Sequence, residues 1–172
     1  MYAELHTHSA YSFLDGASLP VELGAAAVHQ GHSALALTDH DGLHGAMEFA
    51  QAAKPLGLRA ITGAEVTLDD GSHITLLCET ADGYRNLCRL VTRAHEGTRE
   101  RPAEPTQPSV SIDDVERYAD GLVCMSGCAR DGAVAGRVER REYPAAAAMA
   151  RRLSRQSGRA DEPQTMPHPC GC

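Results

Sequence analysis

The residues with the clearest chemical potential are two histidines near the start of the chain. His6 and His8 are separated by one threonine in the segment AELHTHS. On an extended chain, residues i and i+2 project to the same face, so two imidazoles at this spacing converge on one ion. The pair alone is weak evidence for a metal site. It therefore gains weight only if further ligands lie elsewhere in the chain.

Further side chains of metal-ligand type lie in or after apolar segments that we predict to be strands. Asp39 and His40 follow ALALT, Glu65 lies in AITGAEV, and Cys128 follows LVCMS. Ordinary structural roles compete for some of them: Asp15 has the sequence setting of a turn residue, and Asp39-His40 that of a helix N-cap. Glu65 is harder to explain in this way, because a buried carboxylate needs a partner. Together these residues indicate a metal site.

The elements that must position these residues alternate between strands and helices. Patterns of apolar residues and of turn residues predict strands at 2–5, 34–38, 60–68, 73–78 and 122–126. They predict helices at 19–31, 43–54 and 84–95, a short helix capped by Ser111 and Asp114, and a helix at 143–155. This alternation indicates an α/β fold with a largely parallel sheet, in which functional groups gather at the carboxyl ends of strands.

Composition narrows the class of protein. The chain has 172 residues, enough for one domain or one domain plus a tail, and no apolar run is long enough to cross a membrane. The N-terminus has no signal-peptide pattern, so we expect a cytoplasmic protein without a membrane partner. Cys78, Cys88 and Cys124 lie in apolar segments, which favours reduced, buried thiols.

Charge is unevenly distributed along the chain. The net charge of −7 argues against an autonomous nucleic-acid binder. Residues 1–136 carry nine basic and nineteen acidic side chains, whereas 137–159 carry seven arginines and two glutamates. The arginine-rich stretch is either a solvated helix face or a patch that contacts phosphates, and the first alternative is favoured.

Three ordered motifs, ELHTHSAYSFLDGAS, ALALTDHDGLHG and GAEVTL, resemble the polymerase and histidinol phosphatase (PHP) domain. The resemblance is to the version found at the N-terminus of bacterial DNA polymerase III alpha subunits. HITLLCETADGYRNLCRLVTRAH and GLVCMSGCARDG continue it, so that it covers about residues 2 to 155. The phrase AELHTHSAYSFLDGAS is most similar to the error-prone branch of these subunits.

The resemblance implies a distorted (β/α)7 TIM-like barrel that holds up to three divalent metal ions, commonly zinc or manganese, with magnesium as a further candidate. Its catalytic residues would include Asp15 and His40, with Asp39 as a carboxylate that orients His40. The family's metal ligands correspond here to His6, His8, Asp15, His40, Glu65, His73 and Cys128. Of these, His73 opens its predicted strand, and only the resemblance points to it.

One part of the family pattern is missing. Family ligands end with an Asp-x-His pair after a later strand, and this chain has no such pair. We therefore expect residues 1–155 to be a PHP domain truncated at its C-terminus, and 156–172 to be a disordered tail. His168, Cys170 and Cys172 in that tail are either a small metal cluster or a frayed end, and we favour the frayed end. Polymerase domains do not fit in 172 residues.

Three functions remain compatible with this sequence. The first is a PHP module of an error-prone DNA polymerase, with phosphoesterase or 3′–5′ exonuclease chemistry that we expect to be weak in this chain. The second is a metal-stabilised structural module, and the third is a stand-alone phosphatase similar to histidinol phosphatase. In the polymerase setting, DNA would be reached through other domains, with replication or translesion proteins as further partners.

Overall fold

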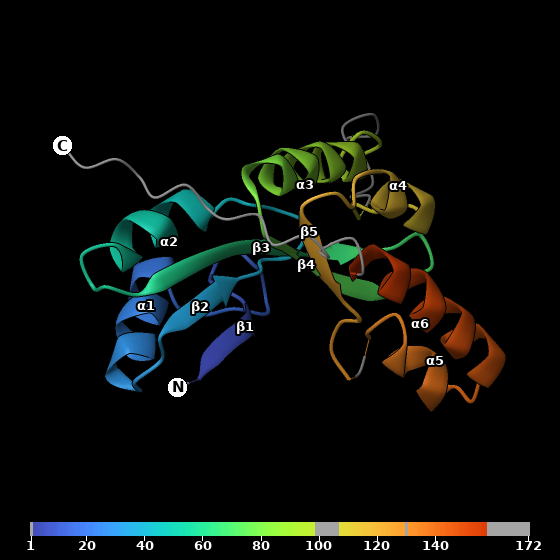
Figure 1. The fold of residues 1–172 in the computed structure, drawn as a ribbon, viewed down its shortest axis with the longest axis horizontal. Helices are drawn as coiled ribbons and strands as arrows, with labels where there is room; N and C mark the ends of the chain where they lie inside the picture. Colours follow the sequence, from blue (N-terminus) through green and yellow to red (C-terminus); the bar gives the residue numbers. More distant parts are fainter. Residues whose placement is uncertain (1, 99–106, 130, 158–172) are drawn as a thin grey trace.

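The computed structural model describes residues 2–98, 107–129 and 131–157. Five strands form one curled sheet in chain order, which makes a mixed α/β half-barrel (Figure 1). The strands are β1 (Ala3–Thr7), β2 (Ala34–Leu37), β3 (Arg59–Thr67), β4 (His73–Cys78) and β5 (Leu122–Met125). The helices are α1 (Pro20–His29), α2 (Ala46–Ala53), α3 (Ala81–Ala94), α4 (Ile112–Arg117), α5 (Ala135–Glu139) and α6 (Tyr143–Ser157). No helix in these ranges is both long and apolar enough to cross a membrane.

The sheet changes direction in its middle. β1, β2 and β3 are parallel, whereas β4 is antiparallel to both β3 and β5. The prediction of a largely parallel sheet is therefore wrong for its second half. A tight turn joins β3 to β4, with Gly71 at φ 79°, and a connection this short can only pair its strands antiparallel. This hairpin places Thr67, at the end of β3, opposite His73, at the start of β4.

Several helix boundaries differ from the predicted ones for local reasons. α3 begins three residues earlier than predicted, because the Thr80 hydroxyl accepts a hydrogen bond from the backbone N–H of Gly83 and caps the helix. Ser111 caps α4 as expected, accepting from the N–H of Asp114. α5 was not predicted, since its five residues carry too little periodicity to be detected.

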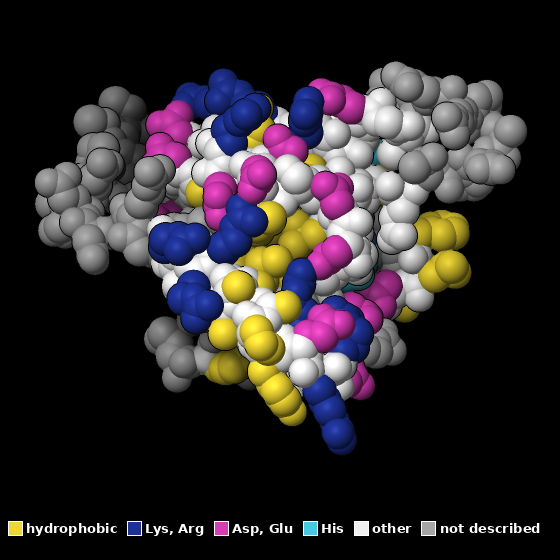
Figure 2. Space-filling view, turned by 90° about the vertical axis from the view of Figure 1, so that its right-hand side faces the viewer, with side chains coloured by type: hydrophobic (Ala, Val, Ile, Leu, Met, Phe, Trp, Pro, Cys, Tyr) yellow, Lys and Arg dark blue, Asp and Glu magenta, His cyan; other side chains and the backbone are white. Residues whose placement is uncertain are grey.

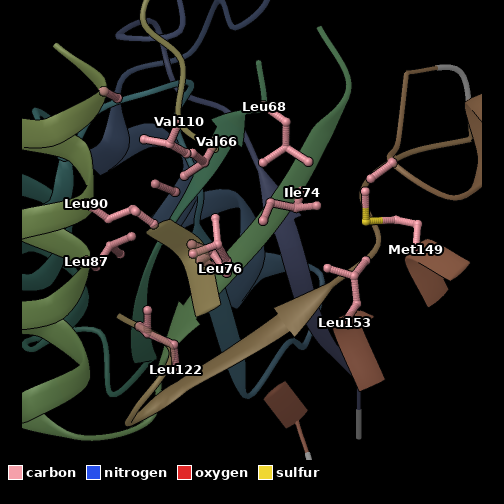
Figure 3. Packing of buried hydrophobic residues seen from close by; sticks show 14 residues of the cluster. Val66, Leu68, Ile74, Leu76, Leu87, Leu90, Val110, Leu122, Met149 and Leu153 are labelled. Atoms are coloured by element: carbon pink, nitrogen blue, oxygen red, sulfur yellow. The ribbon is translucent and has the colours of Figure 1, made fainter. Parts of the chain in front are cut away.

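Two hydrophobic clusters hold the sheet in place. In the larger one, Leu87 and Leu90 of α3 face Val66 and Leu76 of the sheet (Figure 3). Met149 and Leu153 of α6 complete this cluster beside β5. The smaller cluster lies among β2, α1 and α2 and contains Ala27, Leu35, Leu37, Phe49, Ala53 and Leu58. Both clusters restrain the strands whose ends carry the candidate site.

Cys78 and Cys88 are free thiols, as expected. Cys78 and Cys124 are half-buried against the larger cluster, and burial raises the pKa of each thiol to about 12. Thiols with such a pKa stay protonated at neutral pH and are weak nucleophiles. They therefore act as packing residues.

Residues 137–157 of the arginine-rich stretch lie on α5, α6 and the turn between them, and Arg159 lies outside the described residues. Arg137 pairs with Asp70, and Arg152 pairs with Asp113 and with Glu116 at 2.7 Å. Figure 2, which views the molecule from this side, shows basic and acidic side chains intermixed. These pairings favour the solvated helix face over a phosphate-binding patch.

Candidate metal centre

Most of the predicted ligands meet at one edge of the curled sheet. His6 lies within β1, which extends to Thr7 and so is longer than predicted. His8 follows β1, His40 follows β2, and Glu65 lies near the end of β3. Because β1, β2 and β3 are parallel, their carboxyl ends share one edge. β4 runs the opposite way, so its first residue, His73, lies at that same edge.

The donor atoms of these residues form three overlapping groups. Within each group, one nitrogen or oxygen donor per residue lies within 4.8 Å of the others. The groups are His6, His8 and Glu65; His8, Asp15 and His40; and His40, Glu65 and His73. Thus six of the seven predicted ligands are brought together. Cys128, which is half-buried, belongs to no such group among the described residues.

Glu65 lies at the centre of the cluster and is 1% exposed. Its Oε2 contacts Nε2 of His6 and, at 3.1 Å, Nε2 of His8, while its Oε1 lies 3.0 Å from Nδ1 of His73. Burial raises the pKa of this carboxyl, but hydrogen bonds from His6, His73 and His8 outweigh burial and hold the pKa far below its usual range. Glu65 is therefore an ionised carboxylate surrounded by three imidazoles.

His8 links the inner and outer parts of the cluster. Its Nε2 faces Glu65 and its Nδ1 faces Asp15, whose Oδ2 also lies 3.3 Å from Nε2 of His40. Burial lowers the pKa of His8, but hydrogen bonds to Glu65 and Asp15 outweigh it and raise the pKa overall. The hydrogen bond from His8 lowers the pKa of Asp15.

The donor set fits a divalent cation. Both ring nitrogens of His8 face carboxylate oxygens, so without a metal the ring needs two protons to satisfy them. A divalent cation held by His8 with Glu65 or Asp15 would supply positive charge that a ring proton otherwise provides. Four imidazoles and two carboxylates, as found here, suit zinc and manganese.

Asp39 acts through two serines of the loop that precedes Asp15. It is 3% exposed and accepts hydrogen bonds from the N–H and hydroxyl of Ser9 at 2.7 and 2.8 Å and from the Ser12 hydroxyl at 2.7 Å. Within the described residues it makes no hydrogen bond to the imidazole of His40. Instead, the Ser12 oxygen accepts from the backbone N–H of His40 at 3.1 Å. Asp39 therefore positions His40 indirectly, and it also anchors the loop that carries Asp15.

Sequence reasoning missed several supporting residues. Ser9 and Ser12 gave no signal beyond their place in the first motif, because hydroxyl partners are not encoded by local spacing. Asp41, which is absent from the predicted site, is buried and accepts from the N–H and hydroxyl of Thr67 at 2.8 and 2.7 Å. His95 is also absent from the predicted site. It is half-buried, and its Nε2 donates to the Asp41 carbonyl at 2.8 Å.

A curled α/β sheet with histidines and carboxylates clustered at its strand ends defines a barrel-type domain with a candidate metal site. A comparison with known protein families identifies the kind of domain. Residues 4–161 match the PHP domain, and the chain belongs to this family.

Similar proteins add to this assignment. The chain is 40% identical to the error-prone DNA polymerase of Symbiobacterium thermophilum over 164 residues, which cover 89% of this chain and 15% of that protein. It is 44% identical over 138 residues to the error-prone DNA polymerase of Mycobacterium tuberculosis (strain H37Rv), covering 74% and 12%. The chain thus spans about one seventh of these relatives. An amidohydrolase structure from Chromobacterium violaceum shares the fold, with a TM-score of 0.59, 21% identity and coverage of 84% and 74%.

The metal-free protein should lose stability as the pH rises above neutrality. Hydrogen bonds to Glu65 raise the pKa of His73 above 6.5, and those to Glu65 and Asp15 outweigh burial to raise the pKa of His8. A raised pKa stabilises the fold fully below the unfolded value of 6.5, and this gain is lost as the pH passes the folded value. Melting temperatures in chelator should therefore fall as the pH rises above about 6.5. A His8→Gln, His73→Gln variant should show a flatter profile, and an equally steep decline in that variant would contradict the prediction.

Proposed function

We propose that this PHP domain binds divalent metal ions, zinc or manganese first and magnesium as a weaker candidate. The proposed ligands are His6, His8, Asp15, His40, Glu65 and His73. The observation that carries the proposal is the overlap of three donor groups around the buried Glu65. Cys128 remains a candidate ligand only by resemblance.

The proposed activity is hydrolysis of a phosphodiester at the 3′ end of a DNA strand. Divalent ions at such a centre polarise a phosphate ester and promote attack by water. The relatives that support a DNA substrate are named error-prone DNA polymerases. The side chain of Asp15 is 49% exposed and that of Glu65 is 2% exposed, so the Asp15 side is where substrate would reach the cluster.

The residues of the proposed centre have three roles: inner ligands, outer ligands and a residue that positions the outer ligands. Glu65 and the three imidazoles around it hold the inner part of the centre. Asp15 and His40 hold the outer part, nearest the substrate. Asp39 keeps both outer ligands in place through Ser9 and Ser12. We propose that the domain acts within a longer cytoplasmic polymerase of replication and translesion synthesis, whose other domains supply most DNA contacts.

A structural role is the second candidate. Glu65 and His73 come from β3 and β4, and His6 from β1, so ions at the inner part of the cluster would tie three strands together. Such ions would stabilise the barrel whether or not hydrolysis occurs.

Removing metal should lower the melting temperature of the purified chain. A ligand whose free concentration is about one hundred times its dissociation constant stabilises a fold by about 2.7 kcal/mol. For a domain of this size, this corresponds to a rise in melting temperature of about 5–10 °C. Differential scanning calorimetry before and after chelation, with metal analysis of the same sample, measures both. An unchanged melting curve together with absent zinc and manganese would contradict metal binding.

A 3′-labelled single-stranded oligonucleotide, incubated with manganese, separates the two roles. Metal-dependent release of 3′ nucleotides that is lost in His8→Ala supports the phosphoesterase. Metal stabilisation without any release supports the structural module.

A further inference from the structure

Two exposed apolar residues directly precede the candidate ligand Asp15 in the chain. Phe13 is 89% exposed and Leu14 is 98% exposed. The chain has only two phenylalanines, and the other, Phe49, is 1% exposed in the smaller core. Exposing large apolar side chains to water is unfavourable. Their position next to Asp15 in the chain therefore suggests that they contact a ligand.

The loop that carries them is tightly held. The Ser12 carbonyl accepts from the N–H of Asp15 at 3.0 Å and from that of Gly16 at 2.9 Å. The Ser12 hydroxyl donates a hydrogen bond to the buried carboxylate of Asp39. Leu14 adopts φ 68°, in the left-handed region that leucine seldom enters. These bonds fix the backbone of the turn that carries the two exposed apolar side chains.

Phe13 is close enough to meet what the metal centre binds. It lies two residues from Asp15, so their Cα atoms are at most about 7 Å apart. Asp15 in turn contacts His8 and lies 3.3 Å from His40. A phosphate ester held at the Asp15 side of the cluster would therefore lie next to the turn that carries Phe13.

The proposed DNA substrate, and not the charge of the chain, makes a nucleobase the group next to this phosphate. Proteins that bind single strands combine a basic groove for phosphates with aromatic rings for bases. Residues 1–136 are strongly acidic, so this part of the chain has no excess of basic side chains for phosphates. Metal ions would then contact the phosphate, and affinity for the rest of the strand would come from stacking. Two adjacent apolar side chains are about the size of one base. A stable protein–protein interface instead buries about 800 Å² of surface on each partner.

We propose that Phe13, supported by Leu14, is a stacking platform for the terminal base of a single DNA strand whose adjoining phosphodiester lies at the metal centre. This inference rests on the proposed phosphoesterase function and names the part of the substrate that the loop recognises. Phe13 acts here as a positioning residue.

Binding of two labelled oligonucleotides tests the proposal. The probes are a 5′-fluorescent dT10 and the same strand with an abasic 3′-terminal residue, titrated with the full chain in manganese and followed by anisotropy. The wild type should bind dT10 about tenfold more tightly than the abasic strand. Phe13→Ala should abolish this difference, Phe13→Trp should keep it, and Tyr143→Ala, which removes an exposed aromatic residue on α6, should leave it unchanged.

The outcomes also separate this inference from the proposed function. A base preference that survives in Phe13→Ala, or no measurable binding of either strand, overturns the stacking platform. Equal affinity of the wild type for both strands also overturns it and favours a protein partner for this loop. A different result would contradict only the proposed phosphoesterase activity. In that result the base preference depends on Phe13, but no nucleotides are released from dT10.

Discussion

Replacing Glu65 with glutamine should abolish the rise in melting temperature that added zinc or manganese gives the wild type. Glu65 is buried and contacts three histidines that belong to the donor groups. The amide keeps the shape of the side chain but removes the charge that a cation requires. In the metal-free state, removing one partner of a buried ionic cluster costs about 3–5 kcal/mol. Thermal unfolding with and without metal measures both effects.

The matched control is Glu79→Gln, which changes an exposed glutamate just after β4. It should leave both the metal-free stability and the metal-dependent gain close to wild type. A metal-dependent gain that persists in full in Glu65→Gln would show that the ions bind elsewhere. The proposed centre would then be wrong.

Replacing Asp39 with asparagine should weaken metal binding although Asp39 is not a proposed ligand. Its carboxylate accepts three hydrogen bonds that fix Ser9 and Ser12, and an amide cannot accept all three because its nitrogen only donates. The lost bonds should cost about 2–3 kcal/mol of stability. Release of the loop that carries Asp15 should lower metal affinity about tenfold or more, as is typical when partners of metal ligands are removed. Titration calorimetry measures the affinity, and thermal unfolding the stability.

Asp41→Asn is the matched control for the stability and metal affinity of Asp39→Asn. Asp41 is also buried, and its carboxylate also bonds to a backbone N–H and a hydroxyl, both of Thr67. Asparagine tolerates the φ of 46° at this position. Asp41→Asn should therefore lose stability while keeping its metal affinity. Equal losses of affinity in both variants would contradict a specific path from Asp39 to Asp15.

Local sequence predicted most of the elements, because each depends on contacts within a few residues. The apolar run ALALT gave β2, and Ser111 with Asp114 gave the start of α4. β4 has the predicted bounds, His73–Cys78. α5 was not predicted because it is too short for a periodic pattern. The antiparallel half of the sheet was not predicted either.

Some residues of the candidate site were also predicted from local sequence, whereas others were not. His6 and His8 were predicted to converge because their spacing on an extended chain decides it. Glu65 stood out because a carboxylate in an apolar strand demands a partner. His73 followed only from the family resemblance, since a residue that opens a strand reaches the site only when that strand runs antiparallel to its neighbour.

The sequence by itself determined which residue types were available, the family motifs that order them, and the local elements that carry them. Only the tertiary structure decided which of these residues meet. It brought His73 to Glu65 through the reversal of β4, directed Asp39 to Ser9 and Ser12 instead of to the His40 ring, and left Cys128 outside the donor groups. It also buried Phe49 and exposed Phe13. The physical reason is that spacing along the chain fixes contacts over a few residues, whereas strand direction and burial arise from packing among segments far apart in sequence.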